Sequence, residues 1–292
     1  MIVRVLAAGD EKALGIFLAA HADSSMFLRS NLRAAGLVDH GQRHQATYVA
    51  AIEGERIVGV AAHGHNGTIV LQAPAALADV VAAAVDASGR AVRGLLGPWD
   101  QVVAARRALG RATSPTRIAS HEILYGLDLE RLRVPDALKS GAVRWRRAED
   151  GDLELLAAWR AGYRVETNNE IEGPKLTKEA RGDVDALHAA QRAFVLEAAD
   201  RIVATSTFNA ALPDIVQIGG VWTPPDLRGR GYARAVVAGS LLAAREQSVT
   251  RAVLFTNEDN TPARRAYEAI GFRVVGDYGI VGFASSTPGP VA

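Results

Sequence analysis

The stretch that decides the fold is residues 216–233, VQIGGVWTPPDLRGRGYA. It begins as an apolar, strand-like run, which Pro224 and Pro225 end because a proline has no N–H to donate to a neighbouring strand. A glycine-rich turn follows, and then comes the spacing of a helix with one buried face, with apolar residues at 233, 236, 237, 241 and 244. The sequence therefore predicts a strand, a loop and the N-terminus of a helix, in that order.

The start of this helix is suited to binding an anion. The first turn of a helix leaves backbone N–H groups unpaired and carries about half a positive charge. Gly229 and Gly231 have no side chains that would keep a ligand away from those groups, and Arg228 and Arg230 add charged donors. Phosphate groups commonly bind at such a terminus. The segment has neither the Lys-Ser/Thr pair of a Walker loop nor the three-glycine spacing of a dinucleotide-binding turn.

An ordinary glycine-rich turn and an Arg-Gly stretch that contacts RNA are the alternative interpretations of the segment. Its place between a strand and an amphipathic helix disfavours RNA. The whole chain has 33 Lys and Arg against 32 Asp and Glu, a net charge of +1, whereas nucleic-acid and anionic-membrane binding leave a basic footprint. We expect neither nucleic acid nor membrane as a partner.

The composition is that of a globular protein, with 292 residues of which 49% are hydrophobic and 22% charged. The absence of cysteine excludes disulfides, thiolate metal sites and cysteine nucleophiles. Asp10, Glu11 and Lys12 interrupt the apolar N-terminus before a signal-peptide core forms, and no apolar run approaches the ~20 residues that span a bilayer. A cytoplasmic location is the simplest expectation.

The two halves of the chain resemble each other. Residues 48–60 and 194–205 both read as a strand, an acidic turn and an Arg-Ile-Val strand, half a chain length apart. This offset favours a duplicated domain over chance. The mixture of strands and helices implies α/β or α+β domains, each with one sheet covered by helices. We expect a first domain, a linker, a second domain and a flexible tail, at residues 1–134, 135–142, 143–284 and 285–292.

The segment 216–233 resembles the acyl-CoA-binding motif of the GNAT (Gcn5-related N-acetyltransferase) superfamily, which has Arg or Gln followed at fixed spacing by Gly and then Gly or Ala. Arg228, Gly231 and Ala233 match this pattern. Residues 260–272 match a second family feature without a gap, Asn-x-x-Ala-x-x-x-Tyr-x-x-x-Gly-Phe. The clear resemblance covers roughly residues 215–275, and the N-terminal half resembles the family only in the order of its elements.

The resemblance implies two tandem GNAT-like domains, the first degenerate, each with a mixed, mostly antiparallel sheet flanked by helices. It implies an acetyl-CoA-dependent N-acetyltransferase, without a metal, that acts on a primary amine of a small molecule by direct attack in a ternary complex. The alternative is a non-catalytic acyl-CoA sensor or partner-binding module. Longer acyl and aminoacyl donors stay open, as do a monomer and a homodimer.

The resemblance also implies the co-substrate site. The two strands beside the loop would part, helped by a bulge at Gly219-Gly220, and the pantetheine arm would bond to the backbone between them. A backbone N–H near Val221 or Trp222 would stabilise the oxyanion. The expected binding residues are Val221, Trp222, Thr223, Arg228, Gly229, Arg230, Gly231, Tyr232, Ala233 and Asn260. Thr261 reads as the cap of the following helix, with Pro262 at its first helical position.

Two catalytic residues are expected from the same resemblance. Tyr267 would protonate the departing thiolate; its alternative role is that of a half-buried core tyrosine. Glu166 is the candidate for the base or for an acceptor contact, although most such carboxylates are simply solvated, and Glu170 and Glu172 lie nearby. The expected pocket lining is Trp159, Tyr163 and Trp222, with core packing the simpler role for Trp159.

The corresponding segment of the first half, residues 68–77, has no glycine and no arginine. We therefore expect this half not to bind CoA through that loop, but to shape the acceptor pocket or complete the second half's sheet. The pairs His63/His65 and His40/His44 have ligand-like spacing, but no third ligand lies beside either pair. We expect no metal.

Overall fold

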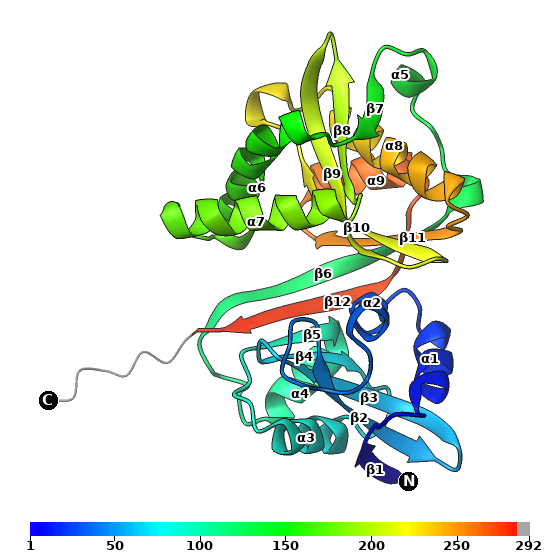
Figure 1. Ribbon diagram of the computed structural model, residues 1–292, viewed down its shortest axis with the longest axis vertical. Helices are drawn as coiled ribbons and strands as arrows, with labels where there is room; N and C mark the ends of the chain where they lie inside the picture. The colour runs from blue at the N-terminus through cyan, green and yellow to red at the C-terminus, as the bar shows by residue number, and fades with distance from the viewer. Residues whose placement is uncertain (285–292) are drawn as a thin grey trace, which may run out of the picture. The chain divides into compact units, whose positions relative to one another are not determined.

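The computed structural model describes residues 1–284, so the expected flexible tail, 285–292, lies outside the described residues. The chain divides into two compact units (Figure 1). The first unit is Met1–Leu124 together with the chain from Val275 onward, and the second is Tyr125–Val274. The segment expected to be a linker contains a short helix, α5 (Asp136–Lys139). The domain boundaries expected from the sequence stay a prediction.

The first unit contains four helices and most of seven strands: β1 (Ile2–Val5), α1 (Glu11–Ala20), α2 (Met26–Ala35), β2 (Ala46–Glu53), β3 (Arg56–Gly64), β4 (Thr68–Gln72), α3 (Leu77–Ser88), β5 (Gly94–Pro98), α4 (Trp99–Ala108), the start of β6 (Thr116–Asp128) and most of β12 (Arg273–Phe283).

Its sheet runs in the order β1-β2-β3-β4-β5-β12-β6. Strand β12, the last of the chain, pairs antiparallel with β5, with Tyr278 opposite Pro98. Strands β4 and β5 pair in parallel. Alternate residues of β2 enter two cores: Tyr48 packs with Leu14 of α1, and Val49 packs with Val81 of α3. Helices therefore cover both faces of this sheet.

The second unit contains the rest of the elements: the end of β6, η1 (Leu129–Arg131), α5, β7 (Arg144–Arg147), η2 (Asp150–Asp152), α6 (Leu153–Asn168), α7 (Pro174–Ala189), β8 (Ala193–Ala198), β9 (Arg201–Ala211), β10 (Ile215–Trp222), η3 (Pro225–Leu227), α8 (Tyr232–Glu246), β11 (Arg251–Asn257), α9 (Thr261–Ala269) and the start of β12.

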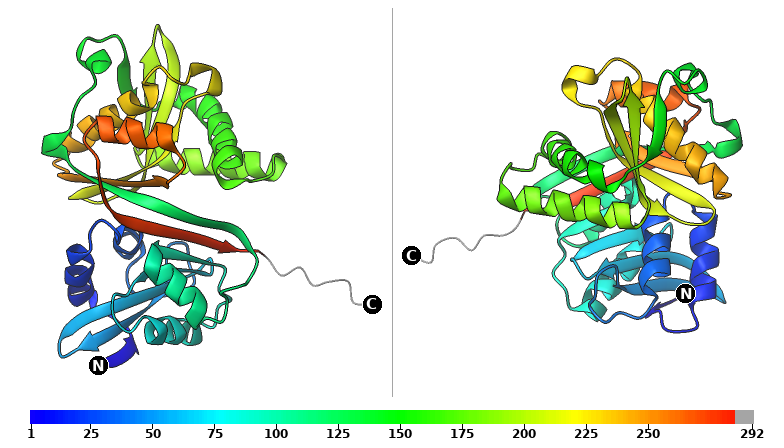
Figure 2. Two further views of the ribbon diagram at one scale, coloured as in Figure 1. Left: turned by 180° about the vertical axis from the view of Figure 1, so that it is seen from behind. Right: turned by 45° about the horizontal axis from the view of Figure 1, so that its top comes forward.

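Its sheet runs in the order β6-β11-β10-β9-β8-β7, and β10 and β11 pair in parallel. Helices α6 and α7 lie on one face and α8 and α9 on the other (Figure 2). Val195 of β8 packs with Leu156 of α6 and Val184 of α7. The expected mixed, mostly antiparallel sheets flanked by helices are confirmed.

Helix α8 is held close to the sheet at one glycine. A Cβ built on Gly239 would lie 2.4 Å from Cγ of Trp145 in β7, so only a glycine fits there. The Trp145 ring also contacts the Phe194 ring of β8, with centroids 6.5 Å apart. This contact positions α8, whose N-terminus is the expected anion site.

We predict that Gly239→Ala lowers the free energy of unfolding, measured by urea denaturation, by about 1–3 kcal/mol, because the new methyl group overpacks against Trp145. The matched control is Gly182→Ala on α7, where an added Cβ meets nothing within 4 Å. The control should gain up to about 1 kcal/mol from helix propensity alone. Equal effects of the two substitutions would contradict the packing argument.

Candidate active site

The two strands beside the loop part from each other. β10 and β11 pair at Ile215↔Arg251, Val216↔Ala252 and Gln217↔Val253. β10 continues to Trp222 and β11 to Asn257, yet the described residues beyond Gln217 and Val253 share no ladder pair. The ends of both strands therefore offer backbone groups to a third, extended partner.

A glycine bulge marks the place where they part. The register between β10 and β9 shifts between Gly219 and Trp222, so the expected bulge is confirmed. A Cβ on Gly219 would lie 2.0 Å from Nδ2 of Asn209, and one on Gly220 would lie 2.8 Å from Oγ1 of Thr207. Gly220 also has φ +56°, which favours glycine. Thr207 Oγ1 donates to the Gly219 carbonyl at 2.8 Å and fixes the bulge.

The loop after β10 delivers unpaired amides to one point. Gly229 and Gly231 have φ of +77° and +78°, and Gly231 is the N-cap of α8 without a side-chain cap. In the described chain, no protein group accepts a hydrogen bond from the amides of residues 229–234. These N–H groups and the positive end of α8 form a site for a phosphate or diphosphate.

The arginine expected to bind pyrophosphate is held in place by three neighbours. Arg228 donates from Nε to the Thr223 carbonyl at 3.0 Å and from Nη2 to Glu166 at 2.8 Å. Its guanidinium lies 5.0 Å from the centre of the Trp222 ring. The structure thus brings Glu166 of α6 to the loop as the ion-pair partner of Arg228, where both side chains are about half exposed.

Sequence reasoning missed Arg234, one position beyond the motif. Its guanidinium folds back over the N-cap, since a Cβ on Gly231 would lie 3.0 Å from its Nε. An arginine in the first turn of a helix with an expected anion site was the available signal. Arg230 donates from Nη2 to the Asp226 carbonyl at 3.3 Å.

Tyr267 lies on α9 with only 8% of its surface exposed. Burial, and then the nearby Tyr163, raise the pKa of Tyr267 well above its ordinary value, so the phenol keeps its proton. Tyr163 of α6 in turn meets Trp222 edge-on, with ring centroids 6.4 Å apart. Tyr163 therefore stands between the bulge strand and the expected acid.

The cap of α9 differs from the expectation. Asn260, not Thr261, is the N-cap, because Oδ1 of Asn260 accepts from the Ala263 amide at 3.3 Å and Thr261 is already helical. The prediction of a Thr261 cap was wrong. Among the described residues, no hydrogen bond joins Asn260 to residues 228–233. Glu170 pairs with Arg164 at 2.7 Å.

A cavity opens between α6, α7 and the sheet of the second unit. Its volume, counted out to the open mouth, is about 360 Å³. The three aromatic residues expected from the sequence all line it, together with side chains that sequence reasoning missed. The lining is Leu156, Trp159, Arg160, Tyr163, Val184, Leu187, Ala193, Thr205, Thr207, Gly220 and Trp222.

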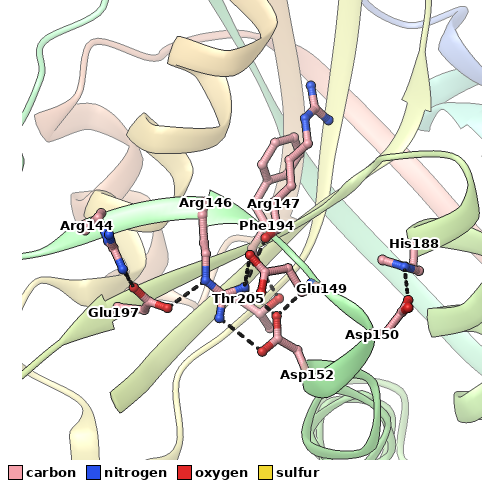
Figure 3. A network of polar contacts seen from close by, with 10 residues as sticks. All are labelled: Arg144, Arg146, Arg147, Glu149, Asp150, Asp152, His188, Phe194, Glu197 and Thr205. Atoms are coloured by element: carbon pink, nitrogen blue, oxygen red, sulfur yellow. Dashed lines mark hydrogen bonds and ion pairs between the residues drawn. The ribbon is translucent and has the colours of Figure 1, made fainter. Parts of the chain in front are cut away.

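An ionic network fixes the start of α6, which carries much of this lining (Figure 3). Arg146 bonds both oxygens of Asp152, at 2.6 and 3.1 Å, and its Nε bonds Glu197 of β8 at 2.6 Å. Burial raises the pKa of Asp152, but the bonds from Arg146 and from the Glu149 amide outweigh it and leave the pKa below its ordinary value. Hydrogen bonds from Arg144 and Arg146 lower the pKa of Glu197.

At the corresponding place in the first unit, the pairing of β4 and β5 also ends before the strands do, at Val70↔Leu96, but the strands stay close together. A Cβ on Gly97 of β5 would lie 2.8 Å from the Leu71 carbonyl of β4, so these strands stay in contact near their ends. The amide of Ala73, just after β4, is already used, since it donates to the buried Oε1 of Gln101 at 2.7 Å. The loop that follows has no glycine, which supports the expectation that this unit does not bind CoA there.

His63 and His65 lie in different surroundings. His63 is buried and its Nδ1 bonds Ser88 Oγ at 2.7 Å, whereas His65 is exposed. Among residues 1–284, no group of three His, Cys, Asp or Glu side chains is arranged to hold a metal ion. None of the helices in the same range has the length and apolar character needed to cross a membrane.

Part of the second unit matches a known protein family. Residues 154–272 match the model of the Acetyltransferase (GNAT) family. This part of the chain therefore belongs to the GNAT family, and the resemblance noted in the sequence is confirmed. The curated proteins contain no match to the chain.

Solved structures match nearly the whole chain. A protein from Drosophila covers 98% of this chain and 99% of its own, at 14% identity and TM-score 0.67. A GCN5-related N-acetyltransferase from Sphaerobacter thermophilus covers 96% of this chain and 94% of its own, at 16% identity and TM-score 0.58. A tandem GNAT protein from the clavulanic acid biosynthesis pathway covers 99% of this chain and 99% of its own, at 14% identity and TM-score 0.53. These identities show the fold alone, which is the tandem GNAT-like fold.

We predict that Asp152→Asn lowers the free energy of unfolding at pH 7 by about 1–3 kcal/mol, because Arg146 loses one of its charged partners. The folded-state pKa of Asp152 is below its unfolded value, so this contribution is full above the unfolded pKa and is lost as the pH falls through the folded pKa. Urea denaturation from pH 7 to pH 3 should therefore show a flatter acid slope for the variant.

The control for this prediction is Asp150→Asn in the same turn. Asp150 is 96% exposed and bonds His188 at 2.9 Å. An exposed pair contributes at most about 1 kcal/mol, so the control should keep the wild-type acid slope. A slope for Asp152→Asn that equals the wild-type slope would contradict the assigned role of the network.

Proposed function

We propose that the chain is an acetyl-CoA-dependent N-acetyltransferase that transfers the acetyl group to a primary amine of a small molecule by direct attack in a ternary complex. One observation carries the proposal: β10 and β11 part beside a loop whose amides, at residues 229–234, have no protein partner among residues 1–284. Family membership of residues 154–272 supports it.

The parted strands suit the pantetheine arm and the helix terminus suits the diphosphate. The backbone of Val221 and Thr223 would bond the arm as an added strand, and the side-chain amide of Asn260 would bond it from the other side. The proposed diphosphate site is formed by Arg228, Gly229, Arg230, Gly231, Tyr232 and Ala233, to which the structure adds Arg234. The residues present therefore fit a diphosphate chemically.

The backbone N–H of Val221 or Trp222 would donate to the thioester oxygen as negative charge develops there. Tyr267, protonated because it is buried, would supply the proton that the sulfur takes on leaving. Glu166 is the proposed carboxylate that accepts the proton from the attacking amine. A diphosphate would compete for its partner Arg228, which would free Glu166 for that role.

Binding calorimetry tests the diphosphate site. We expect CoA to bind once per chain and pantetheine, which lacks the diphosphate, to bind at least about 100-fold more weakly, because several charge-assisted hydrogen bonds are lost. Arg228→Gln should weaken CoA binding without changing that of pantetheine.

The control is Arg245→Gln, an exposed arginine at the far end of α8, which should bind CoA like the wild type. Equal affinity of CoA and pantetheine, or two equivalent CoA sites per chain, would overturn the assignment.

A second prediction concerns the acid. Tyr267→Phe should lower kcat by about 10²–10⁴-fold, the usual range for a general acid, with little change in CoA affinity. Transfer is measured as released CoA with a thiol reagent, which gives no background because the chain has no cysteine. Unchanged turnover would refute the role of Tyr267. Tight acyl-CoA binding without transfer to any amine would favour the sensor alternative.

A further inference from the structure

The cavity between α6 and α7 has an unusual charge for a pocket expected to take an amine. Of its eleven lining residues, Arg160 is the one that carries a charge, and no carboxylate lines the wall. A polyamine or a multiply charged aminoglycoside needs acidic side chains around it, whereas a guanidinium recognises a carboxylate or phosphate. The charge of the lining residues therefore favours an acceptor that carries a negatively charged group.

One hydrogen bond to a protein acceptor is found for the Arg160 guanidinium in the described chain. Its Nε donates to Asp183 at 3.2 Å, and within the described chain no other protein acceptor bonds its guanidinium. Arg164, one turn later on α6, bonds both oxygens of Glu170 and also Glu179. Arg160 lies mostly buried, with 22% of its side chain exposed. Its two Nη groups thus keep the fork that binds a carboxylate with two hydrogen bonds.

The free end of Arg160 lies at the bulge. A Cβ built on Gly220 would lie 3.1 Å from Nη1 of Arg160. Gly220 directly precedes Val221, whose amide is a proposed donor to the thioester oxygen. A carboxylate held by Arg160 therefore places an amine one carbon away next to the reacting carbonyl, and an amine at the end of a long chain would overshoot it.

Apart from Thr205, Thr207 and Tyr163, the rest of the wall is mostly apolar. Leu156, Trp159, Val184 and Leu187 face the cavity from α6 and α7. These side chains suit a compact hydrocarbon group and leave a second charge without a partner.

We propose that the acceptor is an α-amino acid with an apolar side chain, whose carboxylate is bound by Arg160. This inference rests on the proposed acetyl transfer and makes Arg160 the residue that selects the substrate class. The reaction would form an amide bond between the acetyl carbon and the α-nitrogen and break the carbon–sulfur bond. The amine's proton leaves to a base, and the sulfur gains a proton to give free CoA.

The test compares each amino acid with its decarboxylated amine, for example leucine with 3-methylbutylamine and phenylalanine with 2-phenylethylamine. Acetyl transfer is followed by CoA release at saturating acetyl-CoA. We expect KM for the amino acid to be at least about tenfold lower, because a charged hydrogen-bonded pair is lost in the amine. Arg160→Gln should raise KM for the amino acid about tenfold or more and leave that for the amine nearly unchanged, and Arg160→Lys should restore part of the preference.

The matched control is Arg181→Gln on α7, an arginine outside the cavity that pairs with Asp185 and Glu154. It should keep the wild-type preference. Calorimetry with N-acetyl-leucine in the presence of CoA gives a second readout, in which Arg160→Gln should lose binding.

Equal KM values within each pair, or a preference that survives Arg160→Gln, would overturn the inference and leave the acetyltransferase proposal standing. If acetyl-CoA binds but neither member of a pair is acetylated, the inference is also overturned. Failure to bind acetyl-CoA at all would instead defeat the proposed function.

Discussion

The site depends on one constraint, the break in pairing between β10 and β11. Two adjacent glycines permit the bulge beside this break, because a side chain at Gly219 would collide with Asn209 and one at Gly220 with Thr207. Beyond Gln217 and Val253 the two neighbouring strands no longer pair with each other in the described chain. Backbone N–H and C=O groups need a partner when they are removed from water, and an extended amide-rich arm supplies one.

The two units differ at this point, although their elements follow one another in the same order. Both have two parallel strands connected by a helix, β10–α8–β11 and β4–α3–β5. In the first unit Gln101 occupies the amide after β4 and the strands stay together at Gly97. The same order of elements thus gives an anion-binding terminus in one unit and a packed core in the other.

Much of this could be predicted from the sequence because it depends on local patterns. The glycines, the prolines and the helical spacing in residues 216–233 mark the strand, the loop and the helix without any tertiary information. The cap of α9 was misassigned, since Asn260 and Thr261 are both good caps by type and only the hydrogen bond to Ala263 separates them.

The acceptor side could not be predicted in the same way. The cavity collects residues from α6, α7 and three strands, and no spacing along the chain connects them. One signal was available: Arg160 stands four residues after Leu156 and three before Tyr163, on the face of α6 that is otherwise apolar. A charge on a buried face needs a reason, and here the position beside the bulge gives one.

Hydrogen exchange of individual amides, with and without CoA, tests the central claim most directly. The amides of residues 229–234 have no partner in the part of the chain that the structure describes. They should therefore exchange fast in the free protein and be strongly slowed by CoA, together with those that follow the bulge in β10. The loop after β4 in the first unit should not respond. Protection that appears in the first unit, or nowhere near the start of α8, would contradict the account.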